Sequence, residues 1–503
     1  MILWLLLLGG LGIFTYIIVQ RSVAHVTRTP VWLLWLVMML PALIWTFWLL
    51  ANGEDAQIPV LLLLGPFLGC PVLYWLLIQW GRPTPPLPAE SHASSSPEGV
   101  AIASAESKPT IKPINRQEEE TLHHCFPWTV FYLQSVEYLP QALICRGQLR
   151  SSAEVAYQTV RENIETQFGD RFMVVFQEGL NGKPFFALVA NPQAQATAKT
   201  ERRSLNRPGL ALGLLLATLF TTTLAGVVLS GLDPNEFASR TLVTMGLPYA
   251  LSLMSILGVH EFAHYWMAKR YQIRTTYPYF IPIPPTAFFP FGTFGAFIQM
   301  RSPVPHRKAL FDIGIAGPLA GFLVTIPVLF WGLGLSQVVD VTPALTEQAG
   351  PPGFLNFELF NPTASFFIFL LAKLSLGTQL GAEQALRLHP VAIAGCIGVI
   401  VTALNLMPVG QLDGGHIVHA MFGQRTGALI GQVARLLVLA LSFVQRELLL
   451  WAILLFFIPA VDEPALNDVS ELDDRRDLLG LVALAVLVLI ILPTPPAIAR
   501  ILF

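Results

Sequence analysis

Long apolar stretches, each closed by charged or turn-forming residues, dominate the order of hydrophobic and polar positions along this chain. Crossing a bilayer as a helix takes roughly 17 to 25 apolar residues, whereas the strands of a membrane barrel would show short segments of alternating polarity. Stretches of sufficient length lie near residues 2–19, 31–51, 58–79, 208–230, 241–270, 309–335 and 390–407. The pattern therefore predicts an all-α polytopic membrane protein, a transmembrane helical bundle.

Two parts of the apolar pattern give shorter or less regular elements. The stretch at 362–376 is too short for a full crossing and contains Lys373, so we expect a re-entrant or interfacial segment there. Residues 275–302 are too rich in Pro and Gly for a helix and too apolar for an ordinary loop. We expect a membrane-associated hairpin that either offers an edge strand to a substrate or only packs against neighbouring spans.

The basic residues set the predicted orientation. Arg82 opens the polar interval 81–207, and Arg202, Arg203 and Arg207 close it. The positive-inside rule then places this interval in the cytoplasm and the N-terminus outside. The span at 241–270 therefore enters from outside and ends in the cytoplasm at Lys269 and Arg270.

The polar interval itself divides into two parts. Residues 81–120 are rich in Pro, Ser, Ala and Glu and cannot bury enough apolar surface to fold, so they form a disordered linker. Residues 121–198 predict a small cytoplasmic α+β domain in the order strand, helix, strand, strand. Its helix opens at a capping-box pattern of Ser151 and Glu154 and ends near Gly169, and its last two strands flank an Asn181–Gly182 turn.

Composition agrees with a membrane location and narrows the function. Of the 503 residues, 54% are hydrophobic and only 12% are charged, far from the average of a soluble protein. The net charge of −2 gives no electrostatic footprint for a nucleic-acid partner.

Two histidines and a glutamate stand where a bilayer ordinarily admits none, in the stretch LGVHEFAHYWMAKR at residues 257–270. In a helix, His260 and His264 share one face and can both bind a single ion, while Glu261 projects about 100° around, beside that ion. Zinc prefers such ligands, and hydrolysis at zinc needs a carboxylate that accepts the proton of the attacking water. Because ionisable residues within a span are costly, this HExxH motif predicts a zinc site rather than a chance match.

A catalytic zinc site usually has a third protein ligand. The candidate is Asp413 in TALNLMPVGQLDGGH, residues 402–416, where Pro and Gly interrupt an apolar helix. His260 lies nine residues before Lys269, about 14 Å from the cytoplasmic end of its helix, so the third ligand must lie at a similar depth. His416 and His419 remain rival ligands.

The paired motifs resemble the intramembrane zinc metalloproteases of the site-2 protease family. The HEFAH motif at 260–264 is followed by NLMPVGQLDGGH from Asn405, and residues 292–322 are similar to the segment that follows the HExxH span in that family. The resemblance covers about residues 208–425. Residues 121–198, with CRGQLR at 145–150, further resemble the cyanobacterial and chloroplast branch, whereas the first three spans are additional to the family core.

The resemblance implies a function and a site. Zinc is expected on His260, His264 and Asp413, with Glu261 as general base and Asn405 as a stabiliser of the tetrahedral intermediate. The implied activity is a zinc-dependent endopeptidase that cuts the membrane-spanning segments of other proteins within the lipid bilayer. The rival classes are a zinc carrier or sensor, which would need a ligand-lined path across the bilayer, and a catalytically inactive scaffold, which the intact Glu261 disfavours.

The expected organisation follows from these elements. Since no basic or Ser-rich leader precedes the first apolar stretch, we expect a multi-pass protein of a bacterial membrane, either a plasma membrane or a cyanobacterial thylakoid membrane. The expected regions are three spans in 1–80, the linker in 81–120, the small domain in 121–198, the metalloprotease core in 208–425 and C-terminal spans in 426–503.

Overall fold

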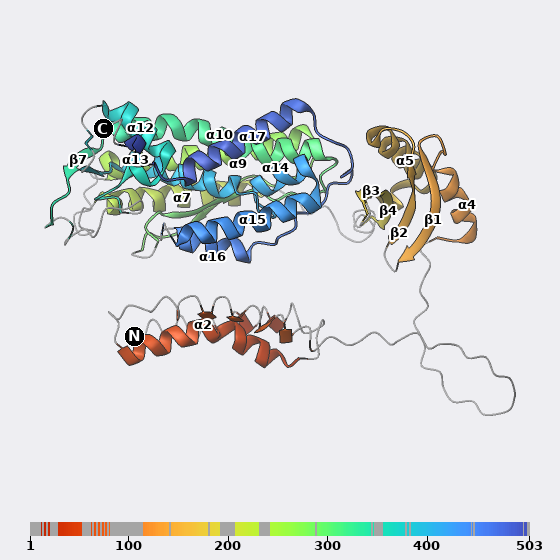
Figure 1. Cartoon of the computed structure of the whole chain (residues 1–503), viewed down its shortest axis with the longest axis horizontal. Coiled ribbons are helices and arrows are strands. Elements are labelled where there is room, and N and C mark those ends of the chain that lie inside the picture. Colours follow the sequence, from red (N-terminus) through yellow and green to blue (C-terminus); the bar gives the residue numbers. More distant parts are fainter. Residues whose placement is uncertain are drawn as a thin grey trace. The chain divides into compact units, whose positions relative to one another are not determined.

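Two compact units, residues 1–106 and 107–503, make up the computed structural model of the chain, which is mostly helical with small sheets (Figure 1). The structure describes residues 29–52, 114–139, 142–179, 182–191, 207–230, 242–343, 356–377 and 384–499 apart from 287–288, 444, 446–447 and 496, together with scattered positions within 12–20, 62–80, 346 and 380–381. Within the first unit, helix α2 (Val31–Asn52) confirms the helix expected at 31–51. Most residues of the stretches expected at 2–19 and 58–79, and most of the linker, lie outside the described residues.

A four-stranded antiparallel sheet and two helices form what we call the sheet domain, residues 114–191. Its strands lie side by side in the order β1-β2-β4-β3. The buried rings of Phe131, Phe176 and Phe186 lie at the centre of its apolar core, and the last two stack with centroids 4.1 Å apart. In chain order its elements are α4 (Arg116–His124), β1 (Phe131–Leu139), β2 (Ala142–Leu149), α5 (Ala153–Phe168), β3 (Phe172–Glu178) and β4 (Pro184–Ala190).

The sheet domain corrects three details of the sequence prediction. A hairpin of two strands, rather than one strand, precedes α5. Helix α4 begins at Arg116, inside the segment expected to be linker, where Asn115 and Glu118 form a capping box. Helix α5 is capped by Ser152, whose hydroxyl accepts a hydrogen bond from the Val155 N–H, and not by Ser151. The end of α5 at Gly169 and the antiparallel pairing of β3 with β4 are confirmed.

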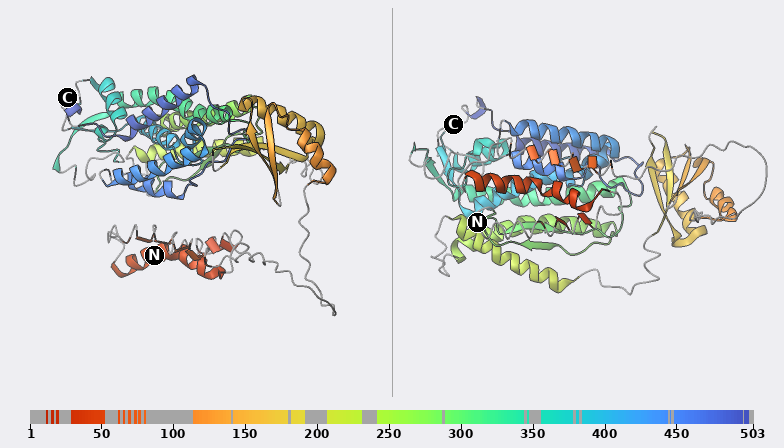
Figure 2. Two further views of the ribbon diagram at one scale, coloured as in Figure 1. Left: turned by 45° about the vertical axis from the view of Figure 1, so that its right-hand side comes forward. Right: turned by 90° about the horizontal axis from the view of Figure 1, so that it is seen from below.

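Apolar helices and two small sheets form most of the rest of the second unit, where α10 contacts α9, α13 and α14 (Figures 1 and 2). The helices expected at 208–230, 241–270, 309–335 and 390–407 are confirmed, the second beginning with a π-helical turn. Their bounds, with those of the helices that follow, are α7 (Pro208–Leu229), η3 (Leu242–Gly246), α9 (Leu247–Arg270), α10 (Arg307–Gly334), α12 (Phe366–Leu376), α13 (Pro390–Leu406), α14 (Asp413–Phe422), α15 (Gln424–Ser442), α16 (Leu449–Phe457) and α17 (Asp474–Ile491).

Length and polarity decide which helices suit a membrane. Among the described residues, four segments are long and apolar enough to cross one: Val31–Trp48, Pro208–Leu229, Arg307–Gly334 and Gln424–Ser442. Helix α9 has 24 residues but carries the polar HExxH motif. Helix α12 has only 11 residues, in agreement with a segment too short for a full crossing.

The expected hairpin at 275–302 is present as a two-stranded antiparallel sheet of β5 (Tyr279–Pro282) and β6 (Thr293–Phe297). The hairpin packs on α7, because the Thr221 hydroxyl donates a 2.7 Å hydrogen bond to the Gly292 carbonyl. The side chain of Phe294 is nevertheless 65% exposed. A second small sheet, of β7 (Gln337–Asp340) and β8 (Gln384–Arg387), had no counterpart in the sequence prediction.

Candidate metal centre

Helix α9 presents the two histidines of the HExxH motif to the interior. The side chains of His260 and His264, one helical turn apart, are 5% and 8% exposed. Glu261 lies beside them and is partly buried. The carboxylate of Glu261 lies within reach of the backbone N–H of Ile298, the residue directly after strand β6.

A sharp turn between α13 and α14 brings Asp413 to the same place. Helix α13 ends at Leu406, and the chain then reverses through Gly410, whose φ of 51° is favourable for glycine. A side chain at Gly414 would have its Cβ 2.1 Å from the Leu406 carbonyl oxygen, so only glycine fits this close turn. As a result α14 begins at Asp413, with the carboxylate facing the histidines of α9.

The three side chains converge with the spacing of metal ligands. Asp413 Oδ2 lies 3.2 Å from His264 Nε2 and 3.6 Å from His260 Nε2, and the two Nε2 atoms are 3.2 Å apart. Two ligand atoms held about 2.0 to 2.1 Å from a tetrahedral zinc lie roughly 3.3 Å apart. Among the described residues, this is the one group of three His, Cys, Asp or Glu side chains with ligand atoms so close together.

The hydrogen bond behind His264 fixes which nitrogen faces the site. Its Nδ1 lies 2.8 Å from the Ile313 carbonyl oxygen, so Nδ1 carries the proton and donates it there. The Nε2 atom of His264 then presents a lone pair towards His260 and Asp413. Lone pairs that converge at these distances repel one another, and a cation between them removes that repulsion.

Glycines on α10 make room for the imidazoles. A Cβ at Gly317 would lie 2.0 Å from His264 Nε2, and one at Gly321 would lie 3.1 Å from His260 Cβ. Helix α10 can therefore approach the ligand face of α9 because these positions lack side chains. The sequence analysis gave these residues no role, although their spacing of four residues in GPLAG marks one face of a helix.

Asn405 lies at the edge of the same group. Its side-chain amide nitrogen is 3.1 Å from His260 Nε2. The rival ligands are engaged elsewhere: His416 Nδ1 and His419 Nδ1 each lie 2.8 Å from Asp462 Oδ2. The structure thus brings His260, Glu261, His264, Asn405 and Asp413 together and holds His416 and His419 in a separate cluster.

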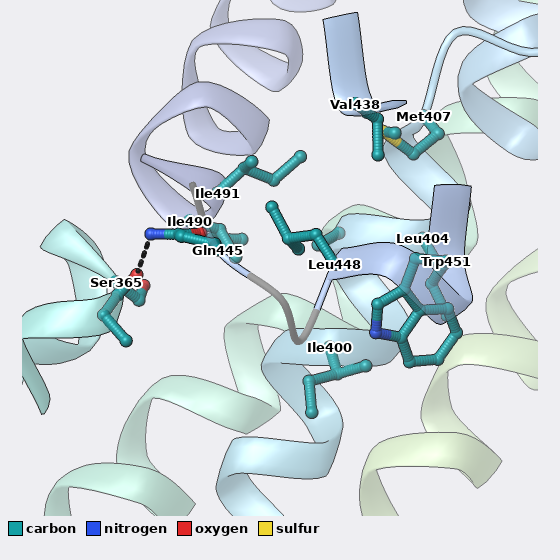
Figure 3. A pocket seen from close by; sticks show the side chains of 12 residues that line it. Ser365, Ile400, Leu404, Met407, Val438, Gln445, Leu448, Trp451, Ile490 and Ile491 are labelled. Carbon is teal, nitrogen blue, oxygen red and sulfur yellow. Dashed lines mark hydrogen bonds between the residues drawn. The ribbon is translucent and has the colours of Figure 1, made fainter. Parts of the chain in front are cut away.

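An apolar cavity of about 80 Å³ lies beside helix α13, and the metal donors are not among its lining residues (Figure 3). Leu404 and Met407 of the α13 end line it, together with Trp451 of α16. Gln445 crosses one side of it and donates a 3.4 Å hydrogen bond to the Ala364 carbonyl. With no titratable side chain in its lining, this cavity offers none of the groups that hydrolysis requires.

Comparisons with known proteins agree with the geometry. Residues 248–445, which contain both the HExxH motif and Asp413, match the model of peptidase family M50. Residues 120–197, nearly all of the sheet domain, match the model of the EGY3 middle domain.

Similar proteins come from plants. The probable zinc metalloprotease EGY2, chloroplastic, of Oryza sativa subsp. indica is 28% identical over 383 residues, which cover 74% of this chain and 65% of that protein. The probable zinc metalloprotease EGY1, chloroplastic, of Arabidopsis thaliana is 27% identical over 402 residues, or 73% of this chain and 69% of that protein. The chain thus spans slightly less than two thirds of the rice protein.

These relatives bear on the earlier expectations. Their names place them in chloroplasts, so they do not support the expected bacterial membrane. Two imidazoles and a carboxylate form a donor set that suits zinc, and zinc is the metal that the names of these relatives specify. Residues 248–445 form a peptidase M50 domain, the domain of the site-2 zinc metalloproteases, and about three quarters of the chain is similar to the EGY zinc metalloproteases of chloroplasts.

Proposed function

We propose that this protein is a zinc-dependent endopeptidase that hydrolyses peptide bonds in the membrane-spanning segments of other proteins. The observation that carries the proposal is the convergence of two imidazoles and a carboxylate, with a further carboxylate beside them, inside a group of apolar helices. Because such a set of ionisable groups is energetically costly in an apolar setting, its presence there indicates a function.

The site residues have distinct roles in this proposal. His260, His264 and Asp413 hold Zn²⁺, which supplies Lewis-acid chemistry for hydrolysis when bound. Glu261 accepts the proton of the attacking water and passes it to the leaving amine. Asn405, whose amide lies 3.1 Å from His260 Nε2, is placed to donate a hydrogen bond to the oxyanion that forms from the substrate carbonyl.

The hairpin of β5 and β6 supplies a way to hold the substrate. A transmembrane helix must unwind before its peptide bond can reach the metal, and pairing with an edge strand would keep it extended. The backbone N–H of Ile298, directly after β6, lies within reach of the Glu261 carboxylate, so the end of β6 lies close to the general base. A groove of about 700 Å³ between the hairpin and the start of α7 adds an apolar wall, with Leu210, Tyr279 and Phe297 in its lining.

The basic residues support a polytopic arrangement with the site near the cytoplasmic face. Lys269 and Arg270 end α9, and Arg307 and Lys308 begin α10. The sheet domain contacts this same end of the helices, because Lys308 Nζ lies 3.6 Å from Glu154 Oε2. We therefore place the sheet domain in the cytoplasm, or in the equivalent compartment of an organelle.

The test is incubation of the purified, zinc-loaded protein with single-span membrane proteins, followed by mass spectrometry of the fragments. We expect cleavage within the span, and we expect Glu261→Gln to retain zinc but lose hydrolysis, because an amide cannot accept the water proton. Full cleavage by Glu261→Gln would remove the proposed role of the carboxylate. If the wild type cleaves no substrate but moves zinc across a vesicle membrane, the protein is a carrier.

A further inference from the structure

A second cluster of histidines and carboxylates lies on the helix that begins with Asp413. Asp462 Oδ2 accepts hydrogen bonds of 2.8 Å from His416 Nδ1 and from His419 Nδ1. The opposite nitrogen of His419, Nε2, lies 2.9 Å from Asp468 Oδ1. We call these four residues the clasp, since they tie α14 to the segment between α16 and α17.

The clasp is buried and charged. His419, Asp462 and Asp468 are 1%, 6% and 7% exposed. Burial alone would raise the pKa of Asp462, but the hydrogen bonds from His416 and His419 outweigh it, and the pKa of this carboxyl lies below its usual range. Both ring nitrogens of His419 face carboxylate oxygens, so a proton on each satisfies both contacts.

The same segment also bonds to the sheet domain through an isolated parallel β-bridge between Phe176 and Asn467. The Phe176 N–H of β3 donates a 2.7 Å hydrogen bond to the Leu466 carbonyl, and the Asp468 N–H donates one of 2.9 Å to the Phe176 carbonyl. On its other side, the Leu466 N–H donates to the Val304 carbonyl, just before α10. Residues 465–468 thus lie between the edge of the domain sheet and the metalloprotease core.

Side-chain packing reinforces this pairing. Leu466 and Val469 pack against the apolar core of the sheet domain. Asp468 therefore belongs to both contacts: its backbone bonds to β3, and its carboxylate bonds to His419 of α14.

We propose that the sheet domain positions the metal site through this segment, by contacts that run from β3 through the clasp to the helix that carries Asp413. The inference rests on the proposed function in taking Asp413 as a metal ligand. His416 lies one helical turn beyond Asp413 and His419 about two, so a shift of the clasp moves the first residue of the same short helix. Asp462 and Asp468 are in this sense positioning residues, since neither lies at the metal donors.

The C-terminal end of α14 is held by α10. The buried Arg307 donates from Nε to the Ala420 carbonyl at 2.9 Å and from Nη2 to the His419 carbonyl at 3.3 Å. Helix α14 is thus held to α10 by its C-terminal carbonyls and to the segment 462–468 by its clasp face. Undocking of the sheet domain would then change the geometry at Asp413.

Zinc affinity and the absorption spectrum of the Co²⁺-substituted full-length protein test the proposal. Asp468→Ala removes a clasp carboxylate, and Leu466→Asp weakens the packing on the sheet domain while leaving the clasp intact. We expect about a tenfold loss of zinc affinity for Asp468→Ala, a smaller loss for Leu466→Asp, and shifted Co²⁺ bands for both. Asp468→Glu should recover part of the affinity, because it restores the carboxylate.

The matched control is Glu463→Gln, which removes a negative charge from the same segment at an exposed position and should leave both readouts unchanged. If Asp468→Ala and Leu466→Asp keep wild-type affinity and spectrum while only their melting temperatures fall, the clasp merely stabilises the fold and the proposal is wrong. If Asp468→Ala does not fold, the zinc affinity and Co²⁺ spectrum of Leu466→Asp test the proposal on their own. A wild-type protein that binds zinc without cleaving any substrate would remove the proposed function but not this inference.

Discussion

The metal donors and the clasp use the same residue types on the same helix, yet their geometry differs. In the clasp, each contact pairs a ring nitrogen with a carboxylate oxygen at 2.8 to 3.1 Å, and the three shortest have the distance of a charge-assisted hydrogen bond. At the metal donors, the shortest distances are 3.2 Å, and one of them joins two ring nitrogens. The clasp pairs ring nitrogens only with carboxylate oxygens, whereas the metal donors bring two ring nitrogens and a carboxylate oxygen around one point, as ligands of a shared cation would be arranged.

The backbone around each cluster explains this difference. His264 is oriented by a carbonyl of α10 and faces a space that the glycines of α10 keep open. The carboxylates of the clasp come from an irregular segment that can adjust each oxygen to a ring nitrogen. The helices thus hold the metal donors at the spacing of metal ligands, while the segment 462–468 places its carboxylates at hydrogen-bond distance from the histidines.

The strongest test of the comparison is Asp413→Ala. Two imidazoles alone do not complete a zinc site, so the variant should lose nearly all of its zinc and its activity. Asp413→Asn should be nearly as damaging, because a neutral amide oxygen is a poorer donor to Zn²⁺. Elemental analysis of the purified variants measures the metal content, and full occupancy in Asp413→Ala would show that the ligand lies elsewhere.

A steric test is Gly317→Ala. The new Cβ would lie 2.0 Å from His264 Nε2, so either the imidazole or α10 must move. We expect at least a tenfold loss of zinc affinity, on the order of what displacing a ligand's support costs. The control is Gly213→Ala on α7, where a Cβ meets no atom within 4 Å and alanine should stabilise the helix slightly. Equal zinc affinity in the two variants would contradict the role given to Gly317.

The candidate site residues that could be predicted from the sequence are those whose placement depends on local geometry. The spacing of His260 and His264 fixes their shared helix face, and the cost of ionisable groups in apolar spans singles out Glu261 and Asp413. The relation of Asp413 to α9 needed a further constraint, the equal depth of the two motifs. The structure brings these residues together, as the proposed site requires.

The parts that sequence reasoning missed depend on contacts between distant segments. Asp462 and Asp468 lie 46 and 49 residues from their histidine partners, in a stretch without helical or strand periodicity. In the sheet domain, a bulge between Leu133 and Ser135 breaks the alternation of β1 and obscured the β1–β2 hairpin. Neither the contacts of the clasp nor the β1–β2 hairpin can be predicted from the sequence without knowing which segments pair.

A smaller effect, on stability alone, is expected for His416→Ala. This variant tests directly whether His416 belongs to the clasp or to the metal donors. Asp462 keeps its hydrogen bond from His419, so the loss should be about 1 kcal/mol of stability, typical of one hydrogen bond. Zinc content measured with zinc in excess should stay at the wild-type level, because His416 bonds to Asp462 and not to the metal donors, and His419 still holds the clasp to Asp462. Chemical denaturation and elemental analysis measure the two quantities. A zinc-free His416→Ala variant, together with an Asp413→Ala variant that keeps its zinc, would instead make His416 the third ligand.

The smallest effect is expected for Lys308→Ala, which removes the ion pair between the core and the sheet domain. Lys308 Nζ and Glu154 Oε2 are 3.6 Å apart, and the two side chains are 34% and 70% exposed, so water and salt screen their attraction. Exposed pairs of this kind contribute about 0 to 1 kcal/mol. The β3 contact and the packing of Leu466 should therefore keep the domain docked, and zinc affinity should change less than twofold. Measuring that affinity at low and high salt checks this expectation. A large loss in Lys308→Ala that grows as salt is lowered would show that charge attraction, rather than strand pairing, holds the domain in place.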